Sequence, residues 1–222
     1  MASLEGHRLQ WLSDQLVEPT NLVFAIVIAS SLELYRDVLV HPIHDRHYIA
    51  ALALASVYTT TVWSWIGWHQ AMARYPYDVS GGELKERWRF YADLGIVIAY
   101  AYMLFRVEPL ITHPDSNILP FLVGFPIVFI LYFFENTLRV LHFDQQARRR
   151  VPLTVWLAVS VAITICYRLA HDHFQSGGSD KHARLWLNGL AIVAAMLAMR
   201  LYRLHNDQYR RKHAKTAASP VS

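Results

Sequence analysis

The chain has one cysteine and few charged residues, and these shortages restrict what the protein can be. Cys166 has no second thiol with which to form an internal disulfide or a thiolate metal site. Charged residues make up 17% of the 222 positions, whereas soluble domains carry about 25%. The sequence also lacks a phosphate-binding glycine loop, a Gly-x-Ser-x-Gly elbow and a His-Glu-x-x-His helix. The residues therefore identify no catalytic class, and the composition argues against a soluble protein.

Long apolar runs are what the sequence has in quantity. Apolar residues make up 54% of the chain, and its mean hydropathy is +0.20. Six runs are each close to the roughly 20 residues that a membrane-spanning helix needs. Because the bilayer core offers no water to backbone groups, these runs must be helices. We predict an all-α, polytopic integral membrane helix bundle with six transmembrane helices at 20–40, 48–69, 89–107, 118–140, 152–169 and 184–203.

The rest of the chain flanks this membrane domain, which covers 20–204. Residues 1–19 predict an N-terminal interfacial helix, and 205–222 predict a basic, partly disordered cytoplasmic tail. An aromatic belt at the inner membrane surface is predicted from Trp63, Trp65 and Trp68. A bend in the outer half of the fourth span is predicted from Pro120, Gly124 and Pro126.

The distribution of positive charge predicts the orientation of the bundle. Lysine and arginine concentrate in loops 70–88 and 141–151 and in the tail, whereas 108–117 has none. Cytoplasmic loops carry the positive excess, so both termini are predicted to be cytoplasmic in a multi-pass protein of a bacterial-type inner membrane. The net charge of +4 then reflects topology rather than nucleic-acid binding, and the bilayer with its anionic lipid head groups is the expected partner. The sequence does not decide whether the protein forms a homo-oligomer.

Seven charged or amide residues in or beside the spans are candidates for a polar intramembrane site: Glu33, Arg36, Arg89, Asp93, Glu135, Arg139 and Asn188. Long arginines near helix ends can reach the head groups, but Asp93 and Glu135 are shorter and are expected to face the bundle interior, a hydrated recess or a cationic partner. Arg89 and Asp93 share one helix face and can neutralise each other. These groups either clamp the helices together or line a route for an ion or small solute. Conduction or transport is the leading functional hypothesis.

Histidines gather in the predicted outer loops and suggest an alternative. Together with nearby aspartates they offer ligands for a divalent transition metal, and the candidates are His41, His44, His47, His171 and His173. The alternative functions are therefore a membrane-embedded metal or haem redox protein, or a non-catalytic membrane assembly partner. No motif decides whether the protein is an enzyme.

Two stretches resemble a known family. "VFAIVIASSLEL", from Val23 to Leu34, resembles the first helix of the six-span potassium channels of bacteria and lysosomes, and "WIGWHQ", from Trp65 to Gln70, is similar to part of their second helix. In place of the family's Phe-Ser-Asp motif this chain has Pro-Thr-Asn at 19–21. The resemblance covers about fifty residues and implies an oligomeric cation channel whose first helix lines the pore, with Ile26 or nearby apolar residues at the constriction.

Overall fold

The protein is described by a computed structural model that covers residues 2–42, 47–73, 84–143, 153–176 and 181–217, with side chains except at 2–17, 84–86, 139–143 and 207–217. Every regular element in this described part is a helix, so the predicted all-α class is confirmed. The elements are α1 (Ala2–Leu34), α2 (Arg36–Val40), α3 (Tyr48–Met72), α4 (Leu84–Phe105), α5 (Glu108–Thr112), α6 (Leu119–Leu122), α7 (Gly124–Phe143), α8 (Leu153–Ser176) and α9 (Lys181–Ala217).

Five helical segments are long and apolar enough to cross a membrane. Their mean hydropathies lie between 1.4 and 1.8, and they are Tyr48–Met72, Arg87–Thr112, Leu119–Leu138, Leu153–Ser176 and Lys181–Asn206. These segments coincide with the last five predicted spans. Their length and composition are those of helices in an integral membrane protein.

The first predicted span is not among these five. Residues 20–40 are divided at Tyr35 between α1 and α2, whereas toward the N-terminus α1 continues through the segment predicted as a separate interfacial helix. The Tyr35 side chain is 2% exposed, and its hydroxyl donates a hydrogen bond of 2.8 Å to the carbonyl oxygen of Leu104 on α4. This bond fastens the end of α1 to the central helices.

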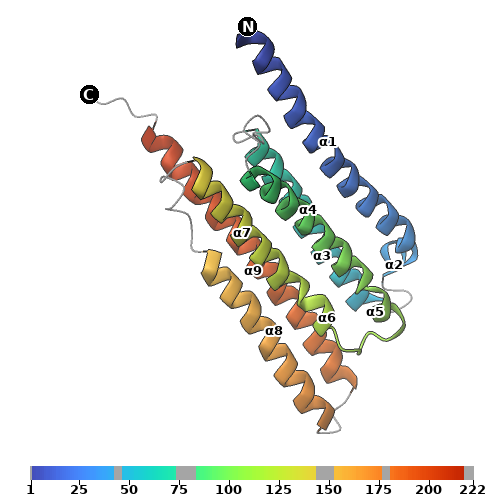
Figure 1. Cartoon of the computed structure of the whole chain (residues 1–222). Coiled ribbons are helices and arrows are strands. Elements are labelled where there is room, and N and C mark those ends of the chain that lie inside the picture. Colours follow the sequence, from blue (N-terminus) through green and yellow to red (C-terminus); the bar gives the residue numbers. More distant parts are fainter. Residues whose placement is uncertain (1, 43–46, 74–83, 144–152, 177–180, 218–222) are drawn as a thin grey trace.

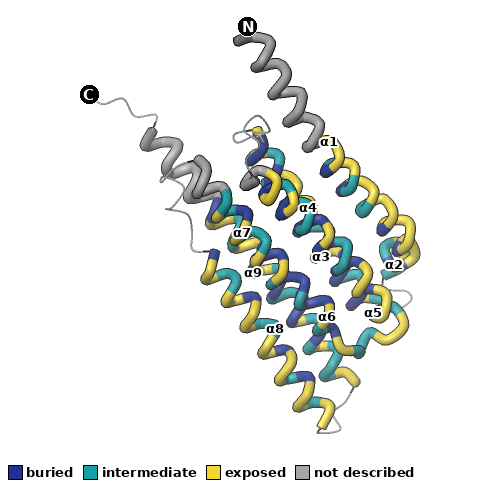
Figure 2. The backbone as a smooth tube through the Cα atoms, viewed as in Figure 1, coloured by how far each residue is buried: buried dark blue, intermediate teal, exposed yellow. Residues whose placement is uncertain are grey.

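Four helices, α3, α4, α7 and α9, form the centre of the bundle. Within this centre, α4 packs against α3 and α7, and α3 also packs against α9 (Figure 1). At the periphery, α8 packs against α7 and α9, and α1 packs against α4. Exposed positions run along the outward faces of α1 and α8 (Figure 2). The start of α1 and the end of α9 lie at the same end of the bundle, which we call the inner end (Figure 1).

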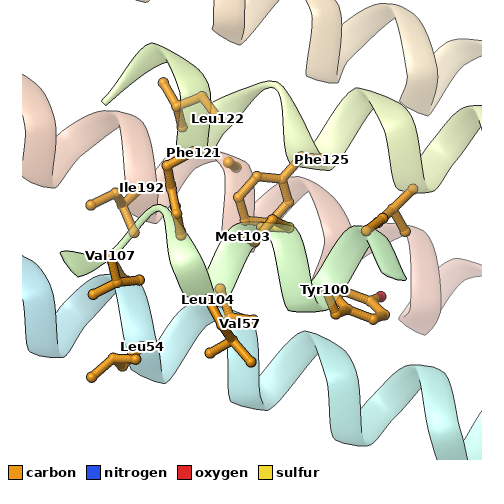
Figure 3. Packing of buried hydrophobic residues seen from close by; sticks show 14 of the residues in the cluster. Leu54, Val57, Tyr100, Met103, Leu104, Val107, Phe121, Leu122, Phe125 and Ile192 are labelled. Atoms are coloured by element: carbon orange, nitrogen blue, oxygen red, sulfur yellow. The ribbon is translucent and has the colours of Figure 1, made fainter. Parts of the chain in front are cut away.

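Large apolar side chains fill the middle of the bundle. Val57, Met103 and Ile192 have no exposed surface and pack with Leu104 and Phe125 between α3, α4, α7 and α9 (Figure 3). Gly124 lets the start of α7 approach α4, because a Cβ atom at this position would lie only 2.2 Å from Met103 Cγ. The helix is interrupted at one residue, Val123, between α6 and α7, and this interruption lies where the sequence predicts a bend in the fourth span.

Candidate functional site

A polar cavity lies in the inner half of the bundle, lined mainly by the four central helices and also by Phe24 of α1 and Leu153 of α8. Its volume is about 70 Å³. The polar and charged side chains that line it are Ser64, Trp68, Asp93, Tyr132, Glu135, Asn136, Arg203 and Asn206. On α3, α7 and α9 they recur at intervals of three or four residues, which places them on one helix face directed at the neighbouring helices. The cavity therefore brings together side chains that lie more than 140 residues apart in the chain.

Arg89 is the largest fully buried side chain near this cavity, with 1% of its surface exposed. Its Nε lies 3.7 Å from Oε1 of Glu135 on α7, and one of its terminal nitrogens lies 3.9 Å from the sulfur of Met72 on α3. Glu135 is itself 7% exposed. A buried charge of one sign beside a buried charge of the other offsets part of the cost of removing each from water. The pair therefore joins α4 to α7 inside the bundle.

Asp93 lies one turn further along α4 and is 5% exposed. Its Oδ2 accepts a hydrogen bond of 3.1 Å from the indole Nε1 of Trp68 on α3. Trp68 is itself 8% exposed, so the prediction that it belongs to a membrane-surface aromatic belt is wrong. An indole N–H needs a partner when it is buried, and here the carboxylate supplies one. The contact fixes one oxygen of Asp93 at the wall of the cavity.

Arg203 brings a second positive charge to the cavity from α9. It donates a hydrogen bond to the hydroxyl of Tyr132, and its Cζ lies 4.9 Å from the centre of the Tyr132 ring. The same hydroxyl is hydrogen-bonded to Ser64 and lies 3.2 Å from the hydroxyl of Tyr100. Among the described residues no carboxylate forms an ion pair with Arg203. Hydroxyl groups and aromatic faces therefore hold this guanidinium in place.

Gly67 makes room for that guanidinium beside α3. A Cβ atom at Gly67 would lie 2.5 Å from one terminal nitrogen of Arg203 and 3.4 Å from its Cζ. Any larger residue at this position would displace the end of the arginine side chain. The absence of a side chain at Gly67 thus decides where the second positive charge of the site lies.

Asn188 has a different environment, in the outer half of the bundle. It has no exposed surface, and its amide nitrogen donates hydrogen bonds of 2.9 Å to the carbonyl oxygens of Pro114 and Ser116. Its side-chain oxygen accepts a hydrogen bond of 3.0 Å from the hydroxyl of Tyr167 on α8. All of these partners belong to the protein itself. Asn188 therefore anchors the connection between α5 and α6 to α8 and α9 and does not line the inner cavity.

The other candidate residues lie away from the cavity, or their side chains are not among those that the structure describes. Glu33 and Arg36 are exposed, at the end of α1 and the start of α2. Arg139 belongs to α7, but its side chain is not among those described. Of the seven candidates, the structure thus brings Arg89, Asp93 and Glu135 together and places Asn188 in a separate cluster.

The predicted metal ligands do not converge in the described residues, where no three His, Cys, Asp or Glu side chains could hold one ion. His44 lies outside the described residues, and His41 and His173 are exposed. His171 is buried, with Nδ1 at 3.4 Å from the Tyr167 hydroxyl and Nε2 at 3.1 Å from the amide nitrogen of Gln175. Both ring nitrogens of His171 therefore lie within reach of neighbouring side chains.

Three side chains that shape the cavity are not among the site residues predicted from the sequence: Trp68, Tyr132 and Arg203. All three lie in the inner turns of predicted spans, where aromatic and basic residues are common at membrane surfaces. The signal that could have found them is the spacing of polar residues within each helix, such as Tyr132 with Glu135 and Asn136. Comparison of the chain with protein-family models, curated proteins and solved structures finds no match.

Proposed function

We propose that this is an integral membrane protein that transports an ion or small solute by way of the inner cavity. The observation that carries the proposal is the set of ionisable groups at that cavity, where Asp93, Glu135 and Arg203 arrive from three different helices. Ionisable side chains inside a membrane are costly, and they commonly mark the pathway of an ion or proton.

The size of the cavity favours a small substrate. A volume of about 70 Å³ is enough to hold a few water molecules. A small ion with part of its hydration shell fits this space, and the carboxylates of Asp93 and Glu135 supply oxygen atoms or proton-accepting groups.

The packed middle of the bundle suggests how the pathway is closed in this conformation. Met103, Phe125 and Ile192 fill the space between the central helices beyond the cavity (Figure 3). Passage from the cavity to the outer end would therefore require these side chains to separate. We infer a cycle in which the cavity exchanges solute at the inner end before the core opens.

The orientation belongs to the same proposal. We infer six crossings with α1 as the first, both termini in the cytoplasm, and a bacterial-type inner membrane as the location. The common end of α1 and α9 (Figure 1) supports an even number of crossings, and the basic loops 70–88 and 141–151 support a cytoplasmic inner end.

Flux measurements on purified protein in liposomes test the transport proposal. Protons, potassium, sodium and chloride should be offered separately, with protein-free liposomes as background. We expect flux of at least one of these ions, reduced close to background by Asp93→Asn and by Glu135→Gln. Asp172→Asn serves as the matched control, because this carboxylate lies in an exposed pair with Arg168 on α8.

The same assay distinguishes transport through the inner cavity from a second candidate function. In this second candidate the protein is an oligomeric channel, and α1 of several copies surrounds the pathway. Its supporting observation is that Ile26, 53% exposed, and Glu33 are exposed positions of α1, in line with the resemblance to the potassium channels. A pathway along α1 predicts flux that responds to Ile26→Asn and Glu33→Gln but not to Asp93→Asn. Absence of flux for every ion, with folded protein in the liposomes, would contradict both candidates.

A further inference from the structure

A second cavity lies between α3 and α9, beside the first. Its volume is about 280 Å³, and its lining includes Trp63, Ile66, Gln70, Arg200, Arg203 and Leu204. Gln70 lies two residues before the end of α3, and Leu204 lies two residues before the end of the last candidate span. The cavity therefore lies at the depth where the apolar part of the bundle ends.

The charged side chains that the structure describes in this α3–α9 cavity are both positive. They are Arg200 and Arg203, and no described acidic side chain lines the cavity. The Arg200 Cζ lies 5.8 Å from the centre of the Trp63 ring, whereas no described carboxylate forms an ion pair with Arg203. Each guanidinium presents a planar set of N–H donors that suits phosphate oxygens, and the side-chain amide of Gln70 adds a neutral polar group.

The surface around the cavity is apolar. Ile66 and Leu204 line it and are 44% and 47% exposed, and on the same two helices Val62 and Leu201 are 42% and 50% exposed. In a membrane these side chains contact acyl chains. A ligand that fits both parts of this surface has an anionic phosphate at one end and hydrocarbon at the other.

We propose that the α3–α9 cavity binds the phosphate head group of an anionic phospholipid from the inner-end leaflet. The head group contacts Arg200 and Arg203, and an acyl chain lies along Ile66 and Leu204. A phospholipid rather than free phosphate is the occupant, because the exposed apolar side chains adjoin the two guanidiniums. This inference depends on the placement in a membrane but not on the transport proposal, so either can fail without the other.

Lipid titration of the detergent-purified full chain by native mass spectrometry tests this inference. The probes are phosphatidylglycerol, the zwitterionic phosphatidylcholine, and inorganic phosphate. We expect phosphatidylglycerol to bind more tightly than phosphatidylcholine. Arg200→Gln should weaken the binding of phosphatidylglycerol by about fivefold, which is the effect of one basic residue at an anionic lipid surface. Arg168→Gln is the matched control, because it removes the same charge from an exposed position on α8.

Three outcomes would overturn the inference. The first is equal phosphatidylglycerol affinity in the wild type and in Arg200→Gln, and the second is an equal loss in the Arg168→Gln control, which would indicate net charge rather than a site. The third is competition by inorganic phosphate at the concentration of the lipid, which would indicate a soluble anion. Arg203→Gln is a second variant, and its affinity for phosphatidylglycerol should fall as that of Arg200→Gln does.

Discussion

Arg89→Ala should lower the free energy of unfolding by roughly 3 to 5 kcal/mol, the effect of removing one partner of a buried ion pair. The guanidinium is 1% exposed, and Glu135, its partner at 3.7 Å, is 7% exposed. Without Arg89, the carboxylate of Glu135 would stay in the bundle interior without the guanidinium that lies 3.7 Å from it. Equilibrium unfolding in mixed detergent micelles, monitored by the fluorescence of the protein's tryptophans, measures this difference.

A double variant separates structural from functional roles of the same pair. Arg89→Met with Glu135→Leu replaces both charges by apolar groups of similar length, and such replacements of buried pairs are often neutral or stabilising. We expect the double variant to recover most of the stability lost by Arg89→Ala and yet to remain inactive in the flux assay. Recovery of both stability and flux would show that the pair serves only to hold α4 and α7 together.

Gly124→Ala should be the most damaging single-methyl change in the core. The new Cβ would lie 2.2 Å from Cγ and 2.7 Å from Sδ of Met103, and Met103 has no exposed surface and is packed among Phe121, Phe125 and Leu104 (Figure 3). Cγ is close to the backbone, so the contact cannot be relieved by moving the end of the side chain. We expect a loss of about 1 to 3 kcal/mol, the usual cost of overfilling a packed core, in the same unfolding measurement.

Gly189→Ala is the matched control for that prediction. Its Cβ would meet only Ile49 Cδ1, at an ordinary distance of 3.6 Å, inside the long helix α9. Alanine favours a helix over glycine by about 1 kcal/mol, so this variant should be as stable as the wild type or more so. If both alanine variants had the same stability, the close approach of α7 to α4 at Gly124 would be contradicted.

Hydropathy was sufficient to predict five spans, because each of these helices is apolar over nearly its whole length. The interruption of the fourth span was also predictable, since Pro120, Gly124 and Pro126 lie within seven residues. The division of residues 20–40 at Tyr35 was not predictable in the same way. The Tyr35 hydroxyl bonds to a carbonyl of α4 that is 69 residues away, and no local pattern in the sequence reports such a contact.

The candidate site was only partly predictable, for a related reason. Asp93 and Glu135 were recognisable because a short charged side chain in an apolar run has little alternative to the bundle interior. Arg203 was not, because a long basic side chain at the end of a span can equally reach the head groups. Its inward placement depends on the missing side chain of Gly67 and on the hydroxyl of Tyr132, both on other helices.

We infer that the cavity of Asp93, Glu135 and Arg203 is a hydrated recess that opens at the inner end of a membrane bundle. Thiol accessibility measures this most directly. With Cys166→Ser as background, Asn136→Cys would place a thiol in the cavity wall, and Val97→Cys would place one in the core, where the valine has no exposed surface.

A membrane-impermeant thiol reagent should then be applied to sealed vesicles of both orientations. We expect Asn136→Cys to react only from the side on which a tail cysteine at Ser219→Cys reacts, and Val97→Cys to react from neither side. If Asn136→Cys reacts in neither orientation, or only from the side opposite the tail, the cavity is not a hydrated recess open at the inner end.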